Sequence, residues 1–98
     1  MKIANILNNK KLSLSFEVFP PKKRSSLESV EKAVKEIAAL KPAFMSVTYG
    51  AGGGTGEYTL DIARTIKKDY GVETLEHLTC VSSSKESVKQ QIKAIKAS

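Results

Sequence analysis

The chain contains three segments with strand-like alternation of apolar and polar residues, and each is followed by a segment with helical periodicity. In residues 12–19 the leucines, Phe16 and Val18 fall on one face, while Glu17 shares the other face with two serines. The strand cannot continue through residues 20–21, because both are prolines whose ring nitrogens cannot donate a hydrogen bond. The first predicted strand therefore carries an acidic side chain near its carboxyl end.

The first predicted helix begins at the pattern Ser25-x-x-Glu28, which has the spacing of a capping box. Apolar residues then recur at steps of three and four, the spacing of one helical face. The residues on this face are Leu27, Val30, Val34 and Ile37. The pattern predicts one amphipathic helix that ends before Pro42.

The second unit consists of a predicted strand, a glycine cluster and a predicted helix. Residues 43–49 alternate, which places Phe44, Ser46 and Thr48 on one face and Met45, Val47 and Tyr49 on the other. The glycine-rich segment 50–56 has the backbone freedom for a tight turn or a close approach to a ligand. The helical stripe that follows comprises Thr59, Ile62, Ala63, Ile66 and Tyr70, and Gly71 lies where a left-handed C-terminal cap is expected.

The third unit repeats this plan at the end of the chain. Residues 73–81 form the third predicted strand, and Ser83-x-x-Glu86 is a second capping-box pattern. The apolar stripe of the last predicted helix comprises Val88, Ile92 and Ile95.

Three such units, spaced by about 30 residues, predict an α/β fold with parallel strands and right-handed crossover helices. A doubly wound sheet buries both faces of its strands, but here each strand has one face of Ser, Thr, Glu or His. A (β/α)₈ TIM barrel explains the polar face, which looks into the barrel and opens onto the active site at the carboxyl ends of the strands. We therefore expect Glu17, Thr48 and His77 to meet at one mouth.

The length of 98 residues sets a limit on this barrel, since a complete one needs roughly 200 residues or more. Residues 1–98 are accordingly interpreted as a partial TIM-barrel domain that holds the first three βα units of a larger barrel. The edge strands of such a piece would be unpaired and would favour self-association.

The composition narrows the location and the partners of the chain. A net charge of +6 favours anionic partners. With one cysteine and one histidine, the chain has no internal disulfide and too few ligands for a zinc site, so we predict a cytoplasmic location and no metal. Cys80 is interpreted as a small buried hydrophobe. No apolar run approaches the roughly 18 residues of a membrane span.

The glycine cluster matches neither of the two common nucleotide-binding loops. Thr55 stands where the third glycine of a Rossmann fingerprint belongs, and no Lys-Ser or Lys-Thr pair follows the glycines as in a phosphate-binding P-loop. Lysines at 85, 89, 93 and 96 form a basic stripe, which is more typical of a solvated helix face than of a nucleic-acid site. We predict no nucleic-acid partner.

Three motifs give the chain a resemblance to a known family. These are SFEVFPPK at residues 15–22, SVTYGAGG at residues 46–53 and HLTC at residues 77–80. In order and spacing they resemble the opening motifs of methylenetetrahydrofolate reductase of the bacterial, FAD-dependent type, and the match extends over nearly all of the chain.

The resemblance implies a TIM barrel that passes a hydride from NADH or NADPH through FAD to 5,10-methylenetetrahydrofolate, giving 5-methyltetrahydrofolate for methionine synthesis. By the same resemblance, Glu17 is the general acid that assists opening of the methylene bridge. Thr48, Tyr49 and Ala51 match FAD-contacting positions, and His77 matches a residue beside the flavin.

The chain departs from the family pattern after Gly53, where relatives commonly have Ser-Thr-Arg and this chain has Gly-Thr-Gly. The later flavin-side and folate-contacting residues of the family belong to units beyond Ser98. The alternative interpretation is therefore a catalytically inactive βα segment that self-associates or complements the missing part.

Overall fold

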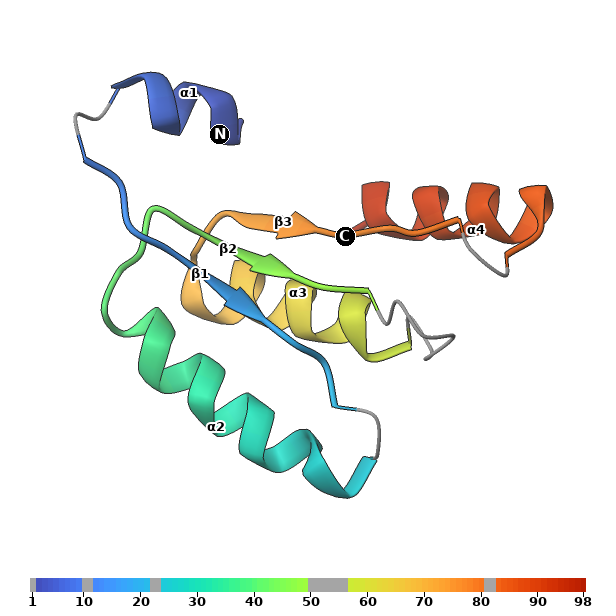
Figure 1. Cartoon of the computed structure of the whole chain (residues 1–98), viewed down its shortest axis with the longest axis horizontal. Helices are drawn as coiled ribbons and strands as arrows, with labels where there is room; N and C mark the ends of the chain where they lie inside the picture. The colour runs from blue at the N-terminus through green and yellow to red at the C-terminus, as the bar shows by residue number, and fades with distance from the viewer. Residues whose placement is uncertain (1, 10–11, 22–23, 50–56, 81–82) are drawn as a thin grey trace.

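The computed structural model describes residues 2–9, 12–21, 24–49, 57–80 and 83–98. Three short strands, β1 (Ser15–Val18), β2 (Phe44–Val47) and β3 (Thr74–Glu76), form one sheet in the order β1-β2-β3 (Figure 1). Both neighbouring pairs of strands are parallel. The predicted α/β class is confirmed, and the arrangement is that of the N-terminal part of a TIM barrel.

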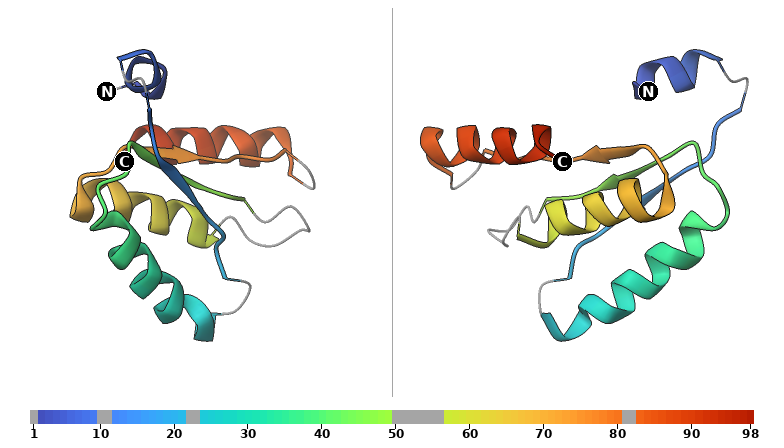
Figure 2. Two further views of the ribbon diagram at one scale, coloured as in Figure 1. Left: turned by 60° about the vertical axis from the view of Figure 1, so that its left-hand side comes forward. Right: turned by 180° about the vertical axis from the view of Figure 1, so that it is seen from behind.

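The helices connect these strands. A 3₁₀ turn, η1 (Arg24–Ser26), leads into α2 (Leu27–Ala38), which ends ahead of Pro42 as predicted. Helix α3 (Glu57–Tyr70) joins β2 to β3, and α4 (Lys85–Lys96) follows β3. Figures 1 and 2 show α2 and α3 on the same side of the sheet. A short helix before β1, α1 (Ile3–Asn9), was not predicted from the pattern of the sequence.

The sheet buries one face against α2 and α3. On this face Phe16 pairs in register with Met45, and Val18 pairs with Val47. The core cluster comprises Val18, Val34, Ala38, Met45, Val47, Ile62, Ala63, Ile66 and Val72. The apolar stripes predicted for α2 and α3 are thus confirmed, because their members lie in this core or pack against it.

Helix α4 differs from the crossover helices α2 and α3 in that none of its residues is buried. Figure 2 shows α4 beside β3, at the side of the sheet away from α2. Its stripe residue Ile92 is 41% exposed. Within the described residues β3 pairs with a strand on one side only, so α4 has less of a surface to cover than α2 or α3.

The observed strands are shorter than the predicted segments 12–19, 43–49 and 73–81. Leu12 and Leu14 are 89% and 60% exposed, so the predicted apolar face before Ser15 is not buried, although the Leu14 carbonyl still accepts from the Ala43 N–H at 2.8 Å. Alternation reports the side-chain pattern, whereas a strand also needs a neighbouring strand with which to pair. The glycine-rich segment 50–56, and with it Ala51, lies outside the described residues.

The predicted helix ends are partly confirmed. Gly71 has φ +67°, the left-handed conformation expected for a C-terminal cap. The predicted capping role of Ser25 is wrong: the residue before α2 is Ser26, which lies in the right-handed helical region and makes no side-chain cap bond.

At the start of α4 the N-cap residue is Ser84, one residue after the predicted Ser83. Its extended backbone allows its hydroxyl to accept from the Ser87 N–H at 3.1 Å.

We expect Ser84→Ala to destabilise α4 by about 1 kcal/mol, because the substitution leaves a first-turn N–H without its side-chain acceptor. Since α4 buries no residue, the loss should appear as faster amide hydrogen exchange within α4 and not as global unfolding. Ser83→Ala is the matched control and should leave the exchange rates of α4 unchanged. Equal effects of the two substitutions would contradict the assignment of the cap.

Candidate functional site

The face of the sheet opposite to the core carries Glu17 and Ser46, and His77 lies at its edge. Glu17 of β1 lies directly beside Ser46 of β2 in the strand register. His77 follows β3 immediately, and its backbone N–H donates to the Val47 carbonyl at 2.9 Å, which extends the ladder by one residue. Parallel strands bring their carboxyl ends to the same edge of a sheet. Three side chains that are far apart in sequence are thereby brought to one place.

The contacts among these side chains converge on one atom. The Ser46 hydroxyl donates to Glu17 Oε1 at 3.1 Å, and His77 Nε2 lies 3.6 Å from the same oxygen. The side chains of His77 and Glu17 are 42% and 46% exposed, and a contact between such exposed side chains stabilises the fold by less than about 1 kcal/mol. The half-exposed pair remains accessible to a small molecule. The predicted meeting of Glu17 and His77 is confirmed, while their chemical roles stay predictions.

Thr48 continues the same edge through its backbone. Its N–H donates to the Val18 carbonyl at 2.9 Å, and its own carbonyl accepts from the hydroxyl of Thr59 at 3.0 Å. Thr59 is fully buried near the start of α3. This bond joins the end of β2 to the helix that follows it, which holds the mouth of the sheet in place.

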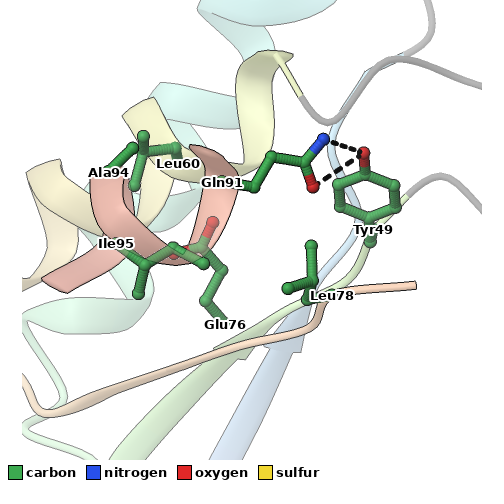
Figure 3. A pocket seen from close by; sticks show the side chains of 7 residues that line it. All are labelled: Tyr49, Leu60, Glu76, Leu78, Gln91, Ala94 and Ile95. Atoms are coloured by element: carbon green, nitrogen blue, oxygen red, sulfur yellow. Dashed lines mark hydrogen bonds between the residues drawn. The ribbon is translucent and has the colours of Figure 1, made fainter. Parts of the chain in front are cut away.

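Tyr49 points away from Glu17 and toward α4. Its hydroxyl accepts from Gln91 Nε2 at 3.1 Å and donates to Gln91 Oε1 at 3.4 Å (Figure 3). The side chain lines a pocket of about 220 Å³ together with Leu60, Glu76, Leu78, Gln91, Ala94 and Ile95. The structure therefore does not bring the phenol of Tyr49 to the Glu17 site. Ala51, the remaining predicted site residue, lies outside the described part of the chain.

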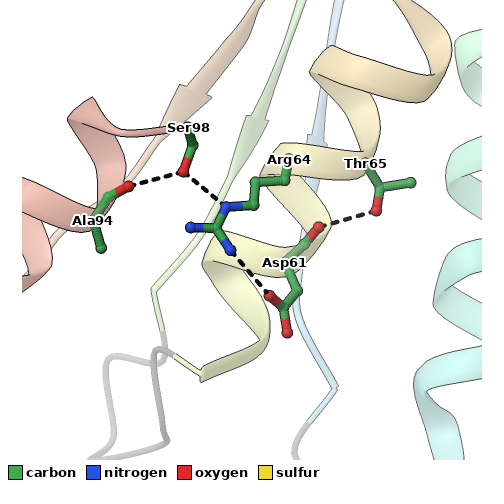
Figure 4. A network of polar contacts seen from close by, with 5 residues as sticks. All are labelled: Asp61, Arg64, Thr65, Ala94 and Ser98. Atoms are coloured by element: carbon green, nitrogen blue, oxygen red, sulfur yellow. Dashed lines mark hydrogen bonds and ion pairs between the residues drawn. The ribbon is translucent and has the colours of Figure 1, made fainter.

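Glu76 is the acidic residue of the pocket that Tyr49 lines. Partial burial raises the pKa of its carboxyl above the ordinary value of 4.5, and the nearby guanidinium of Arg64 opposes the rise. Arg64 Nε donates to Ser98 Oγ at 2.7 Å, and Ser98 Oγ donates to the Ala94 carbonyl at 2.8 Å (Figure 4). These bonds fasten the end of α4 to α3.

We expect Glu76→Gln to raise the free energy of unfolding at pH 7 by less than about 1 kcal/mol, since it removes a charge that is partly desolvated on folding. A raised pKa means that the folded chain binds the proton more tightly, so wild-type stability falls as pH rises through the window above 4.5. The advantage of the variant should therefore vanish in acid, where Glu76 is protonated in both states. Urea unfolding at pH 3 and pH 7 checks this.

Glu36→Gln on the exposed side of α2 is the control for this measurement. A gain of stability for Glu76→Gln that is equal at both pH values would contradict desolvation as the cause.

Two expectations about other sites can be compared with the structure. Cys80 is exposed, so its predicted burial is wrong; it lies four residues beyond the end of β3, past the packed sheet. Among the described residues no group of three or more His, Cys, Asp or Glu side chains could hold a metal ion. In the same part of the chain, no helix is both long enough and apolar enough to cross a membrane.

Ser46 is the site residue that sequence reasoning missed. Its alternation placed it on the polar face, but a serine carries no chemical signal of its own. The strand register, which sets Ser46 beside Glu17, was the missing information.

Comparison with known proteins shows similarity to one family. The family model described as methylenetetrahydrofolate reductase matches residues 2–98. The chain is 43% identical over 89 residues to 5,10-methylenetetrahydrofolate reductase of Buchnera aphidicola subsp. Acyrthosiphon pisum, which covers 91% of this chain and 30% of the relative. It is 35% identical over 78 residues to the protein of the same name from Escherichia coli K12, covering 80% of this chain and 26% of the relative.

A plant relative is similar over almost the whole chain. Methylenetetrahydrofolate reductase (NADH) 1 of Zea mays is 34% identical over 96 residues, or 98% of this chain and 16% of the relative. The chain thus spans less than a third of the length of each of these relatives.

Proposed function

The chain belongs to the methylenetetrahydrofolate reductase family, a family of oxidoreductases, and we propose that it supplies the acid and one wall of the cofactor site for the reaction of that family. That reaction would reduce 5,10-methylenetetrahydrofolate to 5-methyltetrahydrofolate, with NADH or NADPH as the reductant and FAD as the bound cofactor. Residues 1–98 would form the N-terminal part of the barrel that performs it.

The observation that carries the proposal is the constellation at the carboxyl edge of the sheet. Glu17 lies in β1, Ser46 in β2 and His77 directly after β3, and Ser46 Oγ and His77 Nε2 lie 3.1 and 3.6 Å from Glu17 Oε1. A half-exposed carboxyl at this edge can reach a bound folate and can exchange protons with water.

The residues at this edge suit a flavin. Thr48 and the imidazole of His77 would contact FAD, with Tyr49 and Ala51 as further contacts in the segment after β2. The net charge of +6 favours the cofactor's phosphates. When bound, the flavin supplies the hydride chemistry. Glu17 would protonate the folate nitrogen that leaves as the methylene bridge opens to the iminium.

Titration of the purified chain with FAD tests the proposal directly. We expect quenching of flavin fluorescence, a yellow protein after gel filtration, and bleaching of the colour by NADH under anaerobic conditions. His77→Ala should weaken binding, while Thr74→Val, on the core side of β3, should not. A colourless protein with unquenched FAD would contradict cofactor binding by this chain.

A second candidate is an inactive βα segment that assembles with itself or with the rest of a barrel. It is favoured by the sheet edges, since within the described residues β1 and β3 each pair on one side only and Leu75 is 45% exposed. Light scattering of the chain alone, and of the chain mixed with the C-terminal part of the Escherichia coli relative, would reveal either complex.

We propose a cytoplasmic location on the basis of the single cysteine.

A further inference from the structure

We propose that Ser46 is a positioning residue for Glu17, which it orients so that one chosen carboxyl oxygen faces the substrate. The inference deepens the proposed function and rests on it for its chemical meaning. The contact itself can be tested without cofactor or substrate.

Ser46 is held more firmly than the two residues that it accompanies. It is 7% exposed, whereas the side chains of Glu17 and His77 are almost half exposed. It lies in β2, the central strand, between Met45, whose N–H donates to the Glu73 carbonyl, and the bonded end of the strand at Thr48. A hydroxyl fixed by a central strand can hold a mobile carboxyl, because its own position costs no further ordering.

The hydrogen bond selects between the two carboxyl oxygens. Ser46 Oγ and His77 Nε2 both approach Glu17 Oε1, at 3.1 and 3.6 Å. Since both of these contacts are made to Oε1, Oε2 is in this proposal the oxygen that faces a ligand at the mouth. An acid must present its proton toward the reacting nitrogen, so the orientation of the carboxyl plane decides whether Glu17 can act.

The burial of Ser46 also makes the bond hard to replace. A buried hydroxyl without a partner costs free energy, and Glu17 Oε1 is the partner that the structure provides for it. A rotation of Glu17 away from Ser46 would therefore be opposed from both ends of the bond. His77 alone would restrain the carboxyl less, since its side chain is almost half exposed and lies farther away.

NMR of the isotopically labelled chain tests the contact. His77 is the only histidine, so its ring signals are unambiguous, and the Glu17 carboxyl carbon can be assigned through Glu17→Gln. We expect Ser46→Ala to move the Glu17 carboxyl and His77 ring signals at constant pH. Thr74→Val removes a hydroxyl from β3 on the opposite face and should leave both signals in place.

The isosteric pair Ser46→Thr and Ser46→Val separates the hydroxyl from packing, because the two side chains have nearly the same volume. Threonine should restore the wild-type signals and valine should not. Wild-type signals in folded Ser46→Val or Ser46→Ala would overturn the proposal, as would equal signals in the threonine and valine variants.

The catalytic consequence is measured in a chimaera in which this chain replaces the matching segment of the Escherichia coli relative. Ser46→Ala should slow reduction of methylenetetrahydrofolate about tenfold and leave reduction of the flavin by NADH unchanged. Ser46→Thr should recover the rate. Equal slowing of both half-reactions would overturn the positioning role. If the NMR contact is observed but the chain and chimaera bind no FAD, the proposed function fails and the orientation of Glu17 by Ser46 stands.

Discussion

Glu17→Gln should slow reduction of methylenetetrahydrofolate by about 10²–10⁴-fold in the Escherichia coli chimaera, the loss typical of removing a general acid. Glutamine keeps the size of the side chain and a carbonyl oxygen for Ser46, but it has no proton to give. Reduction of the flavin by NADH needs no proton from Glu17 and should keep its rate. Stopped-flow measurement of the two half-reactions separates these effects.

Glu36→Gln on the exposed side of α2 is the matched control, and both of its half-reactions should proceed at the wild-type rate. An equal loss in both half-reactions for Glu17→Gln would indicate damaged flavin binding instead of a lost acid. Wild-type rates in both would remove Glu17 from the mechanism.

Ile66→Ala should destabilise the chain by about 2–5 kcal/mol, which is a large share of the roughly 5–15 kcal/mol that holds a small domain folded. Ile66 is 0% exposed in α3 and belongs to the cluster that packs between the sheet and the two helices. Truncation leaves a cavity that a short sheet cannot close. The measurement is urea unfolding followed by circular dichroism.

Ile92→Ala makes the same chemical change on α4, where the side chain is 41% exposed. We expect it to lower the free energy of unfolding by less than about 1 kcal/mol, because the substitution removes little buried apolar surface. Comparable losses at the two positions would mean that α4 is packed as firmly as α3, contrary to the structure.

The periodicities of the sequence were sufficient for the class of fold. Alternation in 12–19 and 43–49 located β1 and β2, and the stripes at three- and four-residue steps located α2 and α3. These patterns depend only on repeats of 2 and 3.6 residues along the chain, so they can be recognised without knowing which elements pack against one another. Helix α1 was missed, because its seven residues bury only Ile6 and show no sustained stripe.

The candidate site was predictable only in part. That Glu17 and His77 belong to one face followed from alternation, and their 3.6 Å approach agrees with it. The resemblance made Tyr49 an FAD contact, while alternation placed it on the face opposite Thr48, and its side chain lies toward Gln91. Adjacent residues at the end of a strand face opposite ways, so one motif can serve two different places in the fold.

The sequence alone determined the alternating strands, the amphipathic helices, the family and the acidic residue at the end of β1, because each depends on the order of neighbouring residues. Tertiary structure decided the strand register that sets Ser46 beside Glu17, the contact of Tyr49 with Gln91, and the exposure of Cys80 and α4. These features depend on which surfaces meet when residues far apart in the chain pack together, so the local pattern of the sequence does not determine them.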